Sequence, residues 1–90
     1  MEALINKYTT AKLMFQNPSR RDLLFEFGTS HPDVYKPVDE FMKLRGEHAR
    51  AIELEIYPQT QVGTFKTYMF ISDVDQTVCH CIELFIRFMS

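Results

Sequence analysis

The most strongly patterned segment of the chain is residues 73–90, which read DVDQTVCHCIELFIRFMS. Drawn as a helix at about 100° per residue, the segment places a line of apolar side chains along one side: Val74, Val78, Cys81, Phe85 and Phe88. Other apolar residues flank this line, so the apolar side is wider than half of the circumference. The pattern predicts an amphipathic C-terminal helix with more apolar surface than a small domain covers easily.

This wide apolar surface has two interpretations. The helix is either buried between a sheet and the N-terminal segment, or its outer edge is covered by another protein chain. Under the second interpretation the outer edge supplies three candidate partner-binding residues, Leu84, Ile86 and Phe88. Both interpretations stay open, because the spacing of apolar residues is the same in a core helix and in an interface helix.

Two strands are predicted in the second half of the chain. Residues 50–57 alternate apolar and mostly charged side chains, and Pro58 ends this run. Residues 64–72 are rich in β-branched and aromatic side chains, and residues 59–63 between the two runs have turn composition. We expect an antiparallel hairpin whose outer face carries three further partner-binding candidates, Tyr57, Tyr68 and Phe70.

The first half of the chain is less distinctly patterned. Residues 2–15 contain both helical and alternating spacings of apolar residues, so a helix that changes into a strand fits them. Residues 22–27 alternate like a strand after the turn composition of residues 17–22, which predicts a first hairpin. The alternative is a short helix over residues 18–27 that ends at Gly28, and another helix is predicted between Pro37 and Gly46.

Together these elements predict an α+β fold. It is a four-stranded antiparallel sheet, made of two hairpins, with helices packed on one face and the amphipathic helix at the C-terminus. Ninety residues are too few for two independent cores, so residues 1–90 are expected to form a single compact domain.

Composition narrows the classes of function. The formal net charge of -2 gives no overall attraction to nucleic acid or to an anionic membrane. Residues 1–7 do not resemble a signal peptide, and no run is long and apolar enough to cross a bilayer. Two closely spaced cysteines fit free thiols in a reducing compartment. A cytoplasmic protein without a membrane partner is expected.

No residue constellation predicts reaction chemistry. Cys79 and Cys81 flank His80, but residues two apart on a helix point about 200° from each other, so both thiols cannot reach one metal ion. Glu53 and Glu55 share a strand face, where alternating acids are common on a solvated surface. We therefore predict no catalytic residues, no metal, no cofactor and no enzymatic activity.

The leading hypothesis is a small non-enzymatic protein–protein interaction module. It would act as a regulator or inhibitor by burying apolar side chains on the surface of a partner protein, and it would be able to form a homodimer. Small size, the lack of a catalytic signature and abundant apolar surface fit an inhibitor encoded by a virus or mobile element.

The first alternative is a nucleic-acid-binding regulator. A basic patch made of Arg20, Arg21, Lys43 and Arg45 would contact phosphates, while aromatic side chains of the sheet would stack on bases. Glu53 and Glu55 oppose this function, because they would repel the nucleic-acid backbone from the same sheet.

The second alternative depends on the tripeptide His31-Pro32-Asp33. It resembles the loop signature of J-domain cochaperones, which stimulate heat-shock chaperone ATPases. The resemblance covers residues 18–45, and it implies two antiparallel helices joined by this tripeptide. The competing interpretation is a local turn that Pro32 stiffens and that Ser30 or Asp33 caps.

Overall fold

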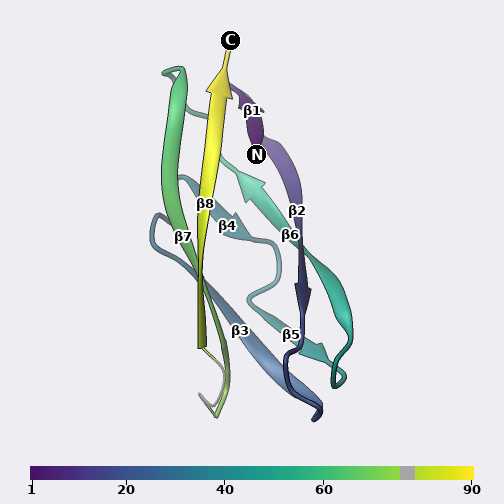
Figure 1. The fold of residues 1–90 in the computed structure, drawn as a ribbon. Coiled ribbons are helices and arrows are strands. Elements are labelled where there is room, and N and C mark those ends of the chain that lie inside the picture. Colours follow the sequence, from purple (N-terminus) through teal and green to yellow (C-terminus); the bar gives the residue numbers. More distant parts are fainter. Residues whose placement is uncertain (76–78) are drawn as a thin grey trace.

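The computed structural model describes residues 1–75 and 79–90, and within these ranges the chain forms strands and no helix (Figure 1). The strands are β1 (Glu2–Leu4), β2 (Thr9–Gln16), β3 (Leu23–Thr29), β4 (Tyr35–Pro37), β5 (Phe41–Leu44), β6 (Ala49–Ile56), β7 (Gly63–Asp73) and β8 (Cys79–Met89). The expected α+β class is therefore wrong, and the domain is all-β. Because the described residues contain no helix, none of them forms a helical membrane span.

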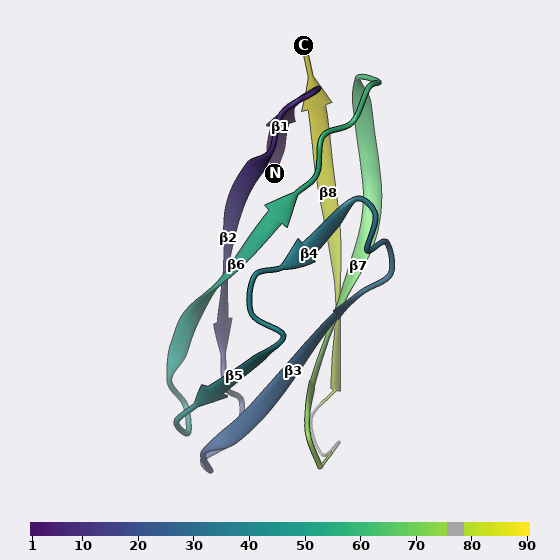
Figure 2. The same ribbon diagram turned by 180° about the vertical axis from the view of Figure 1, so that it is seen from behind.

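The strands form two sheets that pack face to face as a sandwich (Figures 1 and 2). The larger sheet has the order β1-β8-β7-β3-β5, and the smaller sheet has the order β2-β6-β4. All neighbours are antiparallel except β1 and β8, which are parallel. The molecule is elongated along the strands, with extents of 44 × 18 × 16 Å.

The expected C-terminal helix is wrong. Asp73 is the last residue of β7, Val74 and Asp75 lie in a turn, and residues 79–89 form strand β8. Its side chains alternate between core and solvent from Ile82 onward, and Leu84, Ile86 and Phe88 are 6%, 0% and 5% exposed. Ile82, the first residue of this apolar series, packs against the core. The helical interpretation failed because Phe85 and Met89 are apolar although they occupy outward positions of the strand. These two residues hide the strict alternation of a strand, and the segment then resembles the wide apolar side of a helix. Val78 of the supposed apolar line lies outside the described residues.

The other expected helices are strands as well. Residues 2–15 form β1 and most of β2, with Ala3 and Phe15 buried. The region between Pro37 and Gly46 contains the four residues of β5, in which Met42 and Leu44 face the core. The helix proposed for residues 18–27 is also wrong, because β3 begins within that range.

Strands were predicted correctly at β2, β3, β6 and β7, but their pairing was not. β2 pairs with β6, β3 pairs with β5 and β7, and β6 pairs with β4. Neither expected hairpin exists, because its two strands belong to different sheets. The chain crosses the sandwich from β2 to β3 and again from β6 to β7.

A buried asparagine fixes the end of the sandwich where β2 passes into β3. Asn17 is fully buried, and its Nδ2 donates to the carbonyl oxygens of Arg21 at 2.9 Å and of Leu44 and Arg45 at 3.2 Å. Its Oδ1 accepts from the Ser19 amide at 2.9 Å. The side chain therefore joins the β2–β3 loop to the end of β5 and satisfies polar groups that packing removes from water.

Gly46 allows the same two loops to approach each other. A Cβ atom at this position would overlap the carbonyl oxygen of Arg20. The adjacent Glu47 has a positive φ of 63°, and the His48 amide donates to the Arg45 carbonyl at 3.1 Å, which closes a tight turn. The glycine expected to end a helix is needed here for close packing between loops.

Candidate functional site

The outer face of the five-stranded sheet carries a group of exposed apolar side chains. Phe70 on β7 and Phe85 on β8 are 47% and 51% exposed, and Phe41 on β5 is 51% exposed. We define the outer aromatic patch as Leu24, Phe41, Tyr68, Phe70, Cys81 and Phe85. Strand register places its members on one face, because Phe70 lies opposite Cys81 on one side and Gly28 on the other.

Alternation along β7 produces this patch. Thr67, Met69 and Ile71 are fully buried, so the residues between them point outward. The sequence predicted this division of faces correctly, including the outward direction of Tyr68 and Phe70. Beside Phe70, Gly28 presents no side chain, and the Phe70 ring lies 4.0 Å from the position that a Gly28 Cβ would occupy.

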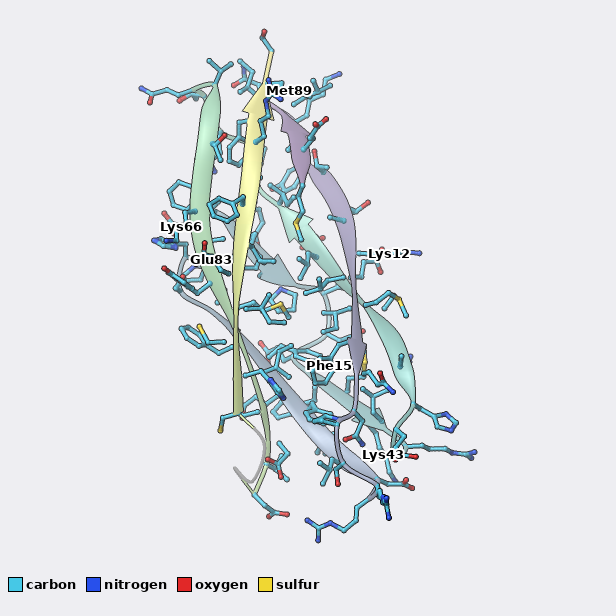
Figure 3. The ribbon with its side chains drawn as sticks, viewed as in Figure 1. Lys12, Phe15, Lys43, Lys66, Glu83 and Met89 are labelled. Carbon is cyan, nitrogen blue, oxygen red and sulfur yellow. The ribbon has the colours of Figure 1, made fainter. Side chains whose placement is uncertain are left out.

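Charged side chains lie among the aromatic residues, because register places Lys66 opposite Phe85, Glu83 opposite Tyr68 and Glu26 opposite Phe41. Lys66 Nζ lies 3.6 Å from Glu83 Oε2 and 5.7 Å from the centre of the Tyr68 ring, and Figure 3 shows Lys66 and Glu83 side by side. A hydrogen bond with Tyr68 and the nearby Glu83 carboxylate raise the pKa of Lys66, so it is a cation at neutral pH. The patch thus has apolar and aromatic residues with a charged pair beside them, as protein interfaces commonly have.

The outer face of the three-stranded sheet differs in character. Register places Lys12 opposite Glu53, and Lys36 Nζ lies 4.0 Å from Glu55 Oε2. The exposed apolar side chains of this sheet are Met14 at 66%, Val38, just after β4, at 46% and Tyr8, just before β2, at 70%. The outer aromatic patch brings three exposed phenylalanine rings to one sheet face, which makes it the stronger candidate site.

The two-sheet arrangement agrees with comparisons to known proteins. Residues 1–87 match the family model described as NPH4 Ig-like domain 4. The chain belongs to this Ig-like domain family. Comparison with curated protein sequences finds no match.

Solved structures similar to this Ig-like domain share its fold at low sequence identity. The MSP-domain-like protein SSP-19 of Caenorhabditis elegans has a TM-score of 0.64 at 8% identity, covering 97% of this chain and 92% of that one. The ASH/PapD-like domain 7 of human CEP192 has a TM-score of 0.65 at 8% identity, covering 99% and 80%. WR4, a C. elegans MSP family member, has a TM-score of 0.59 at 9% identity, covering 99% of this chain and 91% of that one. The family and the fold point to a protein-interaction module, and such domains are typically non-enzymatic.

The Ig-like fold separates the six partner-binding residues expected from the sequence. Tyr68 and Phe70 lie together in the outer aromatic patch. Tyr57 follows β6 in the other sheet, and its ring meets Tyr8 edge-on at 5.8 Å between centroids. Leu84, Ile86 and Phe88 point into the core, so they do not offer an exposed docking edge.

Four patch residues of the Ig-like domain were not among the predicted partner-binding residues: Leu24, Phe41, Cys81 and Phe85. Phe85, Phe41 and Leu24 are exposed on the same face as Phe70. The signal for Phe85 was present, because apolar residues at 82, 84, 86 and 88 alternate with charged residues at 83 and 87. Leu24 on β3 and Phe41 on β5 come to the same face as Phe70 only through pairing across the sheet, which local pattern does not reveal.

The four basic candidates lie at one end of the Ig-like domain. The Asn17 hydrogen bonds hold the loops of Arg21 and Arg45 together, and Lys43 lies opposite Leu24 on the outer face. Arg20 Nε is 3.9 Å from Glu47 Oε1, and both side chains are largely exposed. An acidic residue therefore lies within the basic group.

The cysteines of the Ig-like domain occupy one face of a strand. Cys79 and Cys81 are exposed and two residues apart on β8, so both point outward, and the argument from helical spacing does not apply. His80 points the other way, with its ring 5.9 Å from that of Phe15. Among residues 1–75 and 79–90, no three His, Cys, Asp or Glu side chains are placed to hold a metal ion.

The His31-Pro32-Asp33 segment of the Ig-like domain joins β3 to β4 and does not join two helices. Within this connection the amide nitrogens of Val34 and Tyr35 donate to the His31 carbonyl at 3.0 and 3.2 Å. The His31 ring is fixed by Nδ1, which lies 2.8 Å from Thr67 Oγ1. The J-domain interpretation is therefore wrong, and the interpretation as a local turn agrees with the structure.

Proposed function

We propose that this Ig-like domain binds a partner protein through the outer aromatic patch. The observation that supports the proposal is the exposure of Phe70, Phe85 and Phe41 on one sheet face. Aromatic residues are enriched among those that dominate binding energy at protein interfaces. The Lys66–Glu83 pair, which lies between Phe70 and Phe85 on the same face, supplies charges that favour one orientation of the partner.

The finer role that we propose is that of a regulator or inhibitor. Binding through a flat face covers the surface of the partner and requires no reaction by this chain. The occupant we propose is a different protein, because the family and the fold of this chain are those of protein-interaction modules. We also propose a cytoplasmic location, because Cys81 carries an exposed thiol.

Capture with matched variants tests the proposed surface. The wild-type chain, the double variant Phe70→Asp/Phe85→Asp and the control Met14→Asp are each immobilised and exposed to extract of the native host. Met14 is at least as exposed as the two phenylalanines but lies on the other sheet. Circular dichroism and thermal melts first confirm that all three chains fold.

The proposal predicts that a specific protein binds the wild type and Met14→Asp and is lost from the double variant. A carboxylate in the centre of an apolar interface has no partner and is costly to desolvate, so a loss of at least a hundredfold in affinity, about 3 kcal/mol, is expected. Equal retention by the double variant would contradict the proposal. Sedimentation of the pure chain tests for self-association. A dimer that forms in the wild type and is lost in the double variant would assign the patch to a second copy of the chain.

A further inference from the structure

Strand β8 has an edge that β1 covers only near the C-terminus. β1 pairs with residues 87–89, and Figure 1 shows it beside the upper end of β8. Just before β1, the Met1 amino group donates to the Phe85 carbonyl at 3.0 Å, and the Arg87 amide donates to the Met1 carbonyl at 2.8 Å. The N-terminal segment therefore covers this edge from residue 85 to residue 89.

The backbone groups of Cys81 and Glu83 point toward the uncovered part of the same edge. The Phe85 carbonyl and the Arg87 amide point toward the N-terminal segment. Because the direction of the backbone N–H and C=O groups alternates along a strand, those of Cys81 and Glu83 point to the same edge. β8 pairs one-to-one with β7 from Cys79 to Phe88, without a bulge that would change this alternation. Within the described ranges, no strand pairs with this part of β8 except β7 on its opposite edge.

The core beside this edge is only partly covered. Leu13 on β2 and Ile82 on β8 both pack against the core, yet each is only half-buried. Phe15, two residues after Leu13, meets the His80 ring at 5.9 Å and closes the sandwich near the start of β8; Figure 3 shows Phe15 on β2 between the sheets. Apolar side chains that remain half-exposed next to an open strand edge would be covered by one added strand.

We propose that the β8 edge at Cys81 and Glu83 accepts an extended segment of a partner protein as an additional strand of the five-stranded sheet. Unpaired N–H and C=O groups on a strand edge are complementary to another extended backbone. Residues 80–84 span about 17 Å at roughly 3.3 Å per residue, which suits a segment of about five residues. Alternate residues of that segment are apolar, because they face Leu13 and Ile82.

The occupant is therefore an extended, alternately apolar peptide segment and not a folded surface. This inference goes beyond binding at the outer aromatic patch, and either site can operate without the other. The two proposals are distinguishable, because Phe70→Asp/Phe85→Asp changes side chains on the sheet face and leaves the edge backbone intact.

Amide exchange of the isotope-labelled chain, measured by NMR with the synthetic peptide acetyl-TVKVTVK-amide, tests the edge. The amides of Cys81 and Glu83 are expected to exchange rapidly in the free chain and at least tenfold more slowly with saturating peptide. The amides of Ile82 and Leu84 point toward β7 and are expected to be protected in both states. The same peptide with N-methyl groups at alternate residues cannot complete the ladder and is expected not to bind.

Replacing Glu83 with proline removes an edge amide without removing a hydrogen bond to β7. Glu83→Pro is expected to weaken peptide binding tenfold or more, while Glu83→Gln, which keeps the amide, stays within twofold. Unchanged affinity in a folded Glu83→Pro chain would overturn the proposal. If that variant does not fold, the wild-type exchange experiment decides.

Two exchange results would also overturn the proposal. The first is protection of Cys81 and Glu83 in the dilute free chain, which would mean that the edge is already paired. The second is protection that grows with protein concentration in the absence of peptide, which would assign the edge to a second copy of the chain.

Discussion

Adjacent residues on β8 give the sharpest test of the sandwich. Ile86 is fully buried, whereas Phe85 is 51% exposed on the outer face. Replacing each with aspartate in separate chains places the same charged group on opposite faces of one strand. In the sandwich the Ile86 substitution is the more destabilising one. In an amphipathic helix the Phe85 substitution would be the more destabilising one, because Phe85 would lie on the most apolar line of the helix and Ile86 at its outer edge.

The expected magnitudes differ severalfold. Removing a buried isoleucine side chain costs about 2–5 kcal/mol, and an unpaired carboxylate in the core adds several kcal/mol. A 90-residue domain has about 5–14 kcal/mol of stability at roughly 0.05–0.15 kcal/mol per residue. Ile86→Asp should therefore leave the chain largely unfolded. Phe85→Asp should cost about 1–2 kcal/mol, since it loses strand propensity and the burial of about half of the ring, while its carboxylate lies opposite Lys66.

Urea unfolding followed by far-ultraviolet circular dichroism measures both values. Ile86→Ala, expected to lose about 2–5 kcal/mol, provides a measurable reference if Ile86→Asp has no folded baseline. A folded Ile86→Asp chain combined with an unfolded Phe85→Asp chain would refute the assignment of faces along β8.

Three further substitutions test the loops and the core. Gly46→Ala should lower the free energy of unfolding in urea by about 1–3 kcal/mol, because the added Cβ overlaps the Arg20 carbonyl. In the control Gly28→Ala the added Cβ has its nearest neighbour at 4.0 Å, so the loss should be less than about 1 kcal/mol. Equal losses would count against the close loop contact. Asn17→Ala should lose about 2 kcal/mol or more, because three carbonyls lose their shared donor, and a neutral result would contradict this role. Burial raises the pKa of Tyr35, so its contribution to stability is complete below the unfolded value near 10 and is lost as the pH rises through the folded value. Tyr35→Phe should cost about 1 kcal/mol at pH 7 and reduce the loss of stability above about pH 10, and identical alkaline melts of the two chains would argue against that burial.

Strands with strong alternation could be predicted from the sequence, but their partners could not. Ile52, Leu54 and Ile56 alternate with polar residues so regularly that only a half-buried strand fits. Their neighbours across the sheet come from β2 and β4. Local periodicity shows which face is buried and contains no information about which strand lies alongside, so consecutive strands were paired as hairpins.

The mistaken helices have local physical causes. β5 has only four residues, too few to establish a period, and Pro37 and Gly46 resemble helix start and stop signals. Pro37 in fact lies in β4 at the edge of the smaller sheet, and Gly46 permits close approach of two loops. Tyr68 and Phe70 could be assigned to an outer face from β7 alone, whereas the full patch required the register of four strands.

Site-specific photocrosslinking tests the central claim most directly. A photoreactive phenylalanine analogue is placed at position 70 in one chain and at position 14, on the opposite sheet, in another. The proposed function predicts that position 70 forms an adduct with a partner protein of the native host and that position 14 forms none. Adducts from position 14 alone, or adducts from position 70 only with another copy of the chain, would contradict it.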